Sequence, residues 1–482
     1  MAVDSHTGKY TGTLAKFSSE LNYSDISEAA IYETKRGLLD TLGCALGGIA
    51  VDKGRMGIEC ARRVGGRPES TIIGSSEKIA APMAAFANGE LAHALDYTAL
   101  LPPGHVAPFV IPAVLALAEV RKSSGKEFTT AVVVAHEIAS RIGDALGAFR
   151  TPTGEPLKSH GFGSNIFGAA AGAGKIMKLD AFKMANALGI AGYFAPIPSH
   201  QKFVVTPYNG LQKYGPAGWI AQGGVTAATL AEIGEHGDRQ ILEGEFGFWT
   251  MNGSPVCNWD AMINNLGKNW FLLQAKYKSF PACGTMQSPL GVFIQVINNN
   301  DIKTDEIEQV IVRSDPRGGS PQFMKTEIHD HCDGQNSLFY NIAVAAHRIK
   351  VGPQWQVQST VENPSILSFM KKVKWEPYPR AAEMVYQELE VEKRTYLNRR
   401  PSYVEIHARG QVFSGQTDYA RWISADTPEF RATDKDLKEK FKSNAENVLS
   451  KAKMEAVIDT IMNLEKVHDI NDLIKLLAPD VV

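Results

Sequence analysis

The sequence lacks an excess of charge of either sign: its 482 residues include 50 lysines and arginines against 52 aspartates and glutamates. Domains that bind nucleic acid usually carry a strongly basic surface, so this balance argues against that class of protein. A membrane-spanning run is also missing, because the longest apolar stretch, residues 106–120, is shorter than the roughly 20 residues of a span and contains two prolines. We therefore expect neither a nucleic-acid partner nor a membrane association.

Cysteine is scarce, and the amino terminus shows no targeting segment. The five cysteines are odd in number and widely spaced, which fits reduced thiols inside a cell better than a disulfide framework. The first residues, MAVDSHTGKYTGTLAKFSS, have no apolar core of the kind found in secretory signals, and they lack the arginines of a mitochondrial presequence. These features predict a cytoplasmic protein, with the mitochondrial matrix left open as a second location.

The first half of the chain has the periodicity of helices. Residues 25–48 begin with a candidate cap at Asp25, place leucines at helical spacing and end at Gly47 and Gly48. Glycine and alanine are dense in runs such as FGAAAGAGK (167–175), and small residues let helix backbones approach closely in a buried bundle. We expect further helices over residues 80–96, 108–122, 127–147, 164–178, 181–192 and 216–234.

The pattern changes near residue 270. Residues 307–315 and 403–420 alternate in the manner of half-buried strands, and a helical segment lies between them at 337–349. After residue 427 the pattern is helical again. A chain of 482 residues is too long for one ordinary core. We predict a mainly α fold in which residues 1–272 and 424–482 form one large helical domain, with residues 273–423 inserted as a smaller α+β lid.

Two motifs begin like known ligand sites and then depart from them. In GFGSNIFGAAAGAGKIM (161–177), a phosphate-binding P-loop would need glycine in place of Ala169 and a hydroxyl residue in place of Ile176. His136-Glu137 starts like a zinc-protease helix, but Ser140 stands where the second histidine should be. We interpret the first segment as a packed helix of small residues, and the second as part of a helix that lies either in the core or at the surface.

A denser cluster of chemistry-bearing residues occupies positions 329–333, which read His-Asp-His-Cys-Asp. Histidine, cysteine and aspartate are metal ligands, yet no second paired-ligand motif accompanies the cluster. Three interpretations stay open at this point: a solvated loop, the edge of a pocket, or a metal site.

Other candidate residues are dispersed along the chain. Asp96 ends a helical stretch, and His105 follows after a Pro-Pro-Gly turn, so one short loop joins them. His160 precedes the small-residue helix near residue 164, where a helix amino terminus would favour a bound carboxylate. Lys213 precedes another glycine-rich helix, and Lys278 lies in KSFPACG. Taken singly, a lysine is usually solvated and a histidine usually structural, and spacing alone does not show that these loops meet.

The chain resembles the MmgE/PrpD family, which includes 2-methylcitrate dehydratase, cis-aconitate decarboxylase and iminodisuccinate epimerase. The resemblance covers nearly the full length. It rests on seven segments in order: KRGLLDTLGCALGG (35–48), ANGELAHALDY (87–97) with GH at 104–105, SRIGDAL (140–146), HGFGSNIFGAAAGAGKIMKLD (160–180), LQKYGPAGWIAQGG (211–224), KSFPACG (278–284) and GQNSLFYNIAVA (334–345).

The resemblance implies a large helical domain formed by both chain ends, a smaller α+β lid, a homodimer and no organic cofactor. It identifies His105 as the principal acid/base, with Asp96 and His160 as further catalytic residues. Lys213, Lys278 and Tyr340 are matched to substrate-binding positions, and we add Thr98 to that group. We predict no bound metal.

The chemistry explains why such residues are needed. Removing a proton beside a carboxylate builds negative charge where charge already exists, and lysines with a histidine can stabilise it in a water-poor cleft. A histidine whose pKa is near its ordinary value of about 6.5 can exchange the proton at neutral pH. We expect a lyase for a citrate- or aconitate-type acid, with dehydration of an alkylcitrate-like substrate placed first. Decarboxylation, epimerisation of a dicarboxylate and an inactive binding protein are the alternatives.

This chain departs from the family near the expected pocket. Many members have an acid-rich segment where this sequence continues from Asp96 with Tyr-Thr-Ala-Leu-Leu. Residues 285–289, Thr-Met-Gln-Ser-Pro, also replace a segment that is often basic in relatives. Leu100 and Leu101 in place of carboxylates make that side of the site less polar. We therefore expect a substrate that is partly apolar or carries fewer carboxylates than 2-methylcitrate.

Overall fold

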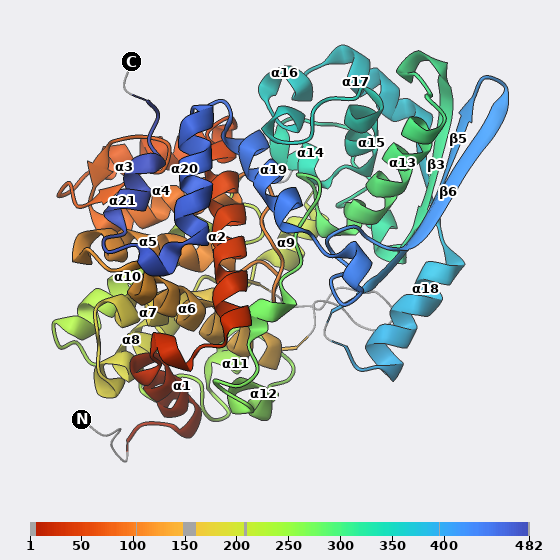
Figure 1. Cartoon of the computed structure of the whole chain (residues 1–482). Helices are drawn as coiled ribbons and strands as arrows, with labels where there is room; N and C mark the ends of the chain where they lie inside the picture. Colours follow the sequence, from red (N-terminus) through yellow and green to blue (C-terminus); the bar gives the residue numbers. More distant parts are fainter. Residues whose placement is uncertain (1–5, 103, 148–160, 207–209, 395, 481–482) are drawn as a thin grey trace.

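The computed structural model describes residues 6–102, 104–147, 161–206, 210–394 and 396–480 (Figure 1). His160 lies outside these residues. The fold is mainly helical, with one four-stranded sheet and one two-stranded sheet, which confirms the predicted class.

The helices expected in the first half of the chain are present within a few residues of their predicted ends. Ser27 caps α2 by accepting a hydrogen bond from the Ala30 amide, and Ser124 forms a capping box with Glu127 at the start of α6. The helices of this part are α1 (Lys9–Glu20), α2 (Glu28–Gly48), α3 (Asp52–Val64), α4 (Ala81–His93), α5 (Ala107–Arg121), α6 (Gly125–Ala145), α7 (Asn165–Ile176), α8 (Ala181–Phe194), α9 (His200–Val205), α10 (Ala217–Glu232), α11 (Phe248–Met251) and α12 (Trp259–Ile263), with the short strands β1 (Ser70–Thr71) and β2 (Lys78–Ile79) between α3 and α4.

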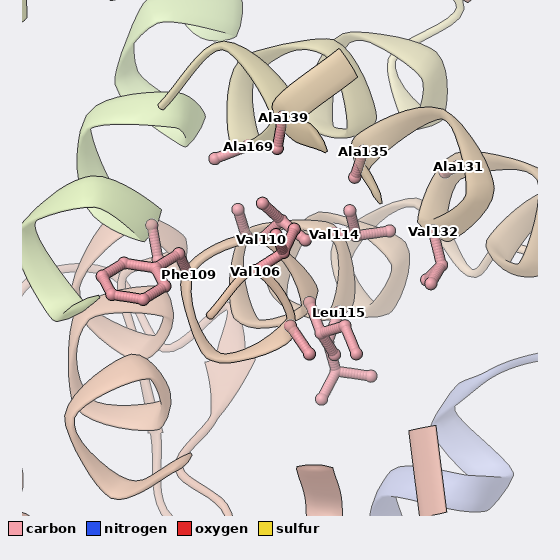
Figure 2. Close-up of a cluster of buried hydrophobic side chains, with 14 of the residues drawn as sticks. Val106, Phe109, Val110, Val114, Leu115, Ala131, Val132, Ala135, Ala139 and Ala169 are labelled. Carbon is pink, nitrogen blue, oxygen red and sulfur yellow. The ribbon is translucent and has the colours of Figure 1, made fainter. Parts of the chain in front are cut away.

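Small residues bring the central helices into close contact, as their density in the sequence predicts. A Cβ atom added to Gly168 of α7 would lie 2.3 Å from the carbonyl oxygen of Ala135 in α6. Figure 2 shows Val110 and Val114 of α5 facing Ala135 and Ala139 of α6. The segment that begins like a P-loop is therefore the buried helix α7, and no larger side chain fits at Gly168 without moving α6.

The second part of the chain forms a sheet covered by helices. Its strands are β3 (Ile307–Ser314), β4 (Val373–Pro377), β5 (Arg399–Ala408) and β6 (Gln411–Tyr419), in the order β4-β3-β5-β6. β3 pairs in parallel with β4 and antiparallel with β5, and β5 forms a hairpin with β6. The helices are α13 (Gln287–Asn299), α14 (His331–Asn336), α15 (Leu338–Ala346), α16 (Gln358–Val361), α17 (Pro364–Phe369) and α18 (Pro379–Tyr386).

The carboxyl-terminal helices return to the first helical unit. These are α19 (Asp434–Ala445), α20 (Lys451–Met462) and α21 (Asn471–Leu476), and Figure 1 shows α20 beside α2. Phe441 and Val457 belong to the same buried apolar cluster as Leu38, whereas Val310 and Ile342 belong to a separate cluster around the sheet. The exact domain boundaries at 272/273 and 423/424, and the motion of a lid, stay predictions.

Two further expectations concern the cysteines and the membrane. All five cysteines are free thiols, in agreement with the predicted reduced state. Among the described residues, no helix combines the length and apolar character that crossing a membrane requires.

A buried lysine from the tail ties α19 to the loops that follow α4 and precede α13. The Lys440 ammonium lies 2.6 Å from the Asp40 carboxylate of α2, and both side chains are almost fully buried. It also donates hydrogen bonds to the carbonyl oxygens of Tyr97, at 2.7 Å, and Lys278, at 3.0 Å. The second Asp40 oxygen accepts a hydrogen bond from the Ala99 amide at 2.9 Å. One ion pair therefore joins the tail, α2 and two loops.

We predict that Lys440→Met destabilises the protein strongly, because it leaves the buried Asp40 carboxylate without its counter-charge. Breaking one partner of such a pair costs about 3–5 kcal/mol of unfolding free energy. Urea unfolding measures the loss. The matched control is Lys442→Met on the same helix, since Lys442 is partly exposed and pairs only with Glu439 and Glu455. Equal stability of the two variants would contradict a structural role for the Lys440 pair.

Candidate active site

Asp96 lies at the centre of the site, just beyond the end of α4. Its backbone has φ +52°, a left-handed conformation that aspartate adopts more readily than most residues. The side chain is almost completely buried. Backbone strain of this kind persists only where surrounding contacts enforce it, and it concentrates at functional sites.

Two lysine ammonium groups compensate the charge of Asp96. Lys213, which precedes α10 and itself has φ +57°, places Nζ 3.0 Å from Asp96 Oδ1. Lys278 places Nζ 2.9 Å from Asp96 Oδ2 and donates a hydrogen bond to the Asp96 carbonyl oxygen at 2.6 Å. The Tyr214 hydroxyl also donates to Asp96 Oδ1. Burial alone would raise the pKa of Asp96, but these cations and the hydrogen bond hold it well below its ordinary value.

His105 lies next to this cluster, on the loop that leads into α5. Its Nε2 atom is 3.4 Å from Asp96 Oδ1 and 3.5 Å from Lys278 Nζ, and its Nδ1 atom is 3.3 Å from the Thr98 hydroxyl. The Asn165 side chain, in the first turn of α7, donates to the His105 carbonyl oxygen at 3.0 Å. These contacts fix both the ring and the loop that carries it.

The pKa of His105 differs from the sequence-based expectation of a value near 6.5. Burial lowers it well below that value, and the nearby Lys278 ammonium lowers it further, while Asp96 opposes the shift. His105 is therefore a neutral imidazole in the folded protein at neutral pH. A neutral imidazole can accept a proton. An anion bound beside it would offset the lowering of its pKa by the Lys278 ammonium.

His93, Asp96 and His105 place ligand atoms within 4.8 Å of one another, an arrangement that could hold a metal ion. His93 is fully buried, and neither of its ring nitrogens has a hydrogen-bond partner among the described residues. Each Asp96 oxygen, however, already faces a lysine ammonium, and two cations this close would repel a third. The electrostatics favour an anion at this point over a metal ion.

A cavity of about 110 Å³ opens beside His105, between the helical unit and the sheet unit. Its lining holds the cationic side chains of Lys276, Lys278, Arg317 and Arg400, and among the described residues Asp96 is the only carboxylate in the lining. The apolar part comes from leucines and Phe162. The remaining lining residues are Leu100, Gly104, His105, His200, Tyr214, Cys283, Gly284, Thr285, Gln322, Leu389, Tyr396 and Leu397.

The structure brings together five of the residues singled out from the sequence. Asp96, His105 and Lys278 line the cavity. Lys213 and Thr98 lie one layer behind: Lys213 contacts Asp96, and Thr98 contacts His105. These two residues therefore position the polar groups of the site and do not face the cavity.

Tyr340 lies apart from the cavity. It is buried in the core around the sheet, and its hydroxyl donates a hydrogen bond to the Trp355 carbonyl oxygen at 2.6 Å. The geometry therefore gives Tyr340 a packing role in place of the predicted contact with substrate. The position of His160 falls outside the described residues.

Sequence reasoning missed Lys276, His200, Arg317 and Arg400 in the cavity lining. For Lys276 a signal was present: it lies two residues before Lys278, and alternate residues of an extended segment point to the same side. The segment is extended there, since Lys276 and Leu100 form an antiparallel bridge. The other three come from distant segments, and only the tertiary fold brings them to the cavity.

In the cluster at 329–333, His331, Cys332 and Asp333 form the buried first turn of α14, and Asp330 precedes them as its cap. Within the cluster only His329 is exposed, before the helix, so the solvated-loop interpretation fits that residue alone. The Asp330 carboxylate caps the helix by accepting hydrogen bonds from the amides of Cys332, at 2.8 Å, and Asp333, at 3.1 Å. Asp333 forms a buried ion pair with Lys325 at 2.7 Å. The two carboxylates are thus engaged in capping and charge pairing.

Both halves of the chain match the domain models of one protein family. The MmgE/PrpD N-terminal domain model matches residues 12–255, and the MmgE/PrpD C-terminal domain model matches residues 280–465. A cis-aconitate decarboxylase of Aspergillus terreus is 25% identical over 394 residues, covering 75% of this chain and 77% of the relative. The cis-aconitate decarboxylase of Homo sapiens is 24% identical over 486 residues (95% and 92%), and that of Mus musculus is 25% identical over 494 residues (97% and 93%).

We predict that Asp96→Asn destabilises the fold by about 3–5 kcal/mol, because it leaves two buried ammonium groups without a carboxylate. Adding Lys213→Met to this variant should restore part of the loss, since one of the two uncompensated charges is removed. Glu59→Gln, at an exposed carboxylate of α3 paired with Arg63, is the control and should change stability little. Urea unfolding at neutral pH measures all four proteins. An Asp96→Asn variant as stable as the parent would contradict the central role of this carboxylate.

We also predict that the protein loses stability as the pH falls below about 6.5. Burial lowers the pKa of His136 to about 4 and of His331 to about 3, and it lowers those of His93 and His105 as well. Between the folded and unfolded pKa values only the unfolded chain binds these protons, so the stabilisation present above pH 6.5 is lost on acidification. Each such histidine contributes up to about 1.4 kcal/mol per pH unit.

Urea unfolding between pH 8 and pH 5 measures this slope, and His136→Gln should reduce it by the contribution of one proton. A slope between pH 7 and pH 5 that is the same in the parent and in His136→Gln would show that His136 does not take up a proton on unfolding.

Proposed function

The chain belongs to the MmgE/PrpD family, and we propose that it is a lyase that acts on a small citrate- or aconitate-type carboxylic acid. The observation that carries this proposal is the charge of the cavity beside His105. Four cationic side chains line it, and Asp96, the one carboxylate that the described part of the chain contributes to the lining, is already paired with two lysines. A cavity of this composition attracts an anion, and a neutral imidazole at its wall supplies a group for proton transfer.

In the proposed reaction His105 takes a proton from the carbon beside a substrate carboxylate. The electron pair of that C–H bond forms the new carbon–carbon double bond as the bond between the adjacent carbon and its hydroxyl oxygen breaks. The departing hydroxide then takes a proton from the His105 imidazolium and leaves as water, which returns His105 to its neutral form. Lys278 lies within 3.5 Å of His105 Nε2, so its ammonium group is close to where negative charge develops on the substrate. Asp96 keeps Lys278 in place, and the Asp96 charge then stabilises the imidazolium that forms.

Decarboxylation is the second candidate, and the names of the relatives favour it. The same cavity would hold a substrate whose carbon–carboxylate bond breaks, releasing CO2 and leaving the electron pair on carbon, where an acid delivers a proton. The leucines of the lining, Leu100, Leu389 and Leu397, would favour this step, because a carboxylate removed from water is easier to lose as neutral CO2. Both reactions require the same carboxylate binding and proton transfer at carbon.

The proposal is tested by offering the purified protein 2-methylcitrate, citrate and cis-aconitate in separate assays. Unsaturation is followed by ultraviolet absorbance, CO2 by release from the carboxyl-labelled acid, and deuterium incorporation by mass spectrometry in D2O. We expect turnover of at least one acid, and a loss of about 10²–10⁴-fold in His105→Ala, the usual contribution of a general acid/base. The matched control is His468→Ala, which replaces an exposed histidine outside the cavity lining.

The outcomes separate the candidates. A conjugated product without CO2 identifies a dehydratase, CO2 release identifies a decarboxylase, and deuterium exchange without net product identifies an epimerase. Full activity of His105→Ala would contradict the assignment of the proton carrier. The absence of turnover and of binding for every acid would support the inactive alternative and overturn the proposed function.

A further inference from the structure

Lys276 differs from the other buried lysines of the protein. Seven lysine side chains in the described part of the chain are buried, and six of them have a carboxylate within ion-pair distance. Lys276 is the seventh, and it has no ion pair with any described residue. Lysine is almost never buried without a partner, because removing the ammonium group from water is unfavourable. The six pairs are Lys35–Glu465, Lys53–Glu90, Lys213–Asp96, Lys278–Asp96, Lys325–Asp333 and Lys440–Asp40.

Asp426 and Glu388, the two carboxylates that act on the charge of Lys276, form ion pairs with other residues. Asp426 pairs with Arg394 at 2.5 Å. Glu388 pairs with Arg399 at 3.0 Å and also accepts hydrogen bonds from the backbone amides of Asn398 and Arg399. The Lys276 ammonium makes only weak contacts with described residues: the Leu397 carbonyl oxygen lies 3.4 Å away, and the Tyr396 ring centre 5.7 Å away.

The backbone holds Lys276 at the cavity wall. The Leu100 amide donates to the Lys276 carbonyl oxygen at 2.7 Å, and the Lys276 amide donates back to Leu100 at 3.0 Å. This bridge joins the segment before Lys278 to the loop between Asp96 and His105. Arg400, at the start of β5, lines the same cavity and acts on Lys276 as a second positive charge. Two cations therefore line the same cavity, and none of the described residues supplies an anion that pairs with Lys276.

We propose that Lys276, together with Arg400, forms a second carboxylate-binding locus, which takes an anionic group of the substrate remote from the carbon that His105 deprotonates. Leu100, Leu389 and Leu397 line the cavity with these groups. The ligand that fits has two carboxylates joined by a short, partly apolar carbon chain, with one carboxylate at Lys278 and the other at Lys276. This inference rests on the proposed function, because it assigns the far end of the same substrate site.

The charge state of Lys276 supplies a second observable. Burial, assisted by the charges of Arg400 and Arg394 and opposed by those of Asp426 and Glu388, lowers the pKa of Lys276 to about 8. Lys278 and Arg317 face the same cavity, and Tyr396 lies against the lysine. Below pH 8 the ammonium form is available to bind a carboxylate, and above pH 8 it is progressively lost. Affinity for a dicarboxylate should therefore fall as the pH rises from 7 to 9.

The experiment compares two probes of five carbons, glutarate with two carboxylates and pentanoate with one, by isothermal titration calorimetry at pH 7. We expect the parent protein to bind glutarate about 10- to 100-fold more tightly than pentanoate, the range for a hydrogen bond to a charged group. Lys276→Met should abolish this difference and leave pentanoate binding unchanged. Lys268→Met, at an exposed lysine of the preceding segment, controls for the change in net charge and should bind as the parent does.

Two further measurements separate ligand binding from a structural role. Lys276→Met should keep or raise the melting temperature, because it removes an unpaired buried charge, and Lys276→Arg should remove the loss of glutarate affinity above pH 8, since a guanidinium stays protonated. Equal binding of the two probes by the parent, unchanged glutarate binding in Lys276→Met, or a lowered melting temperature would each overturn the proposal. Failure of the proposed function is distinguishable, since it would appear as absent lyase turnover while the preference for glutarate remains.

Discussion

The buried carboxylate of Asp96 is the interaction on which the rest of the site depends. It lies between the ammonium groups of Lys213 and Lys278, accepts a hydrogen bond from Tyr214 and stands 3.4 Å from His105. Without it, two cations would be buried next to each other at high electrostatic energy. With it, the cluster carries an excess of positive charge that only an anion in the cavity can balance. The left-handed backbone of Asp96 and Lys213 is explained by this arrangement, because both side chains must turn inward to meet.

The two structural units meet at this cluster. Gln335 of α14 donates a hydrogen bond to the carbonyl oxygen of Ala94 at 2.6 Å, and Gln356 donates to the carbonyl oxygens of Leu95, at 2.9 Å, and Pro281, at 2.6 Å. The backbone immediately before Asp96 is thus held by side chains from the sheet unit. From the other direction, Lys440 of the tail holds the carbonyl oxygens of Tyr97 and Lys278. The carboxyl-terminal tail and the sheet unit together hold the short segment around Asp96.

Much of the fold could be predicted from local sequence. Caps, helical periodicity and strand alternation gave the main helices of the first half and the strands β3, β5 and β6, because these signals are contained within single segments. β4 and α3 were not predicted, since the first pairs with a strand about 60 residues away and the second has few apolar residues. The P-loop-like segment was interpreted correctly as a packed helix, and the structure places the His136 segment, which was left open between core and surface, in the core. The homodimer expected from the family, the lid motion and the domain boundaries stay predictions.

The residues of the candidate site could be predicted where a local sequence motif contains them. They could not be predicted where the tertiary fold brings distant segments to the cavity. Asp96, His105 and Lys278 were identified from motifs, and the structure places them together at one cavity. Lys213, Thr98 and Tyr340 were assigned to substrate contact, but burial depth cannot be read from a motif, and all three side chains lie outside the lining. The lowered pKa of His105 could not be predicted from the sequence either, because it depends on burial and on the distance to Lys278.

The cavity beside His105 is a cationic site in which Lys276 is partly uncharged at pH 8 until an anion binds. The most direct measurement is calorimetric titration of tricarballylate, a tricarboxylate without a leaving group, at pH 8 in buffers of different ionisation enthalpy. We expect binding to take up protons from the buffer, because a bound carboxylate raises the pKa of Lys276 and thereby favours its charged form. Binding without net proton uptake, or with proton release, would contradict it.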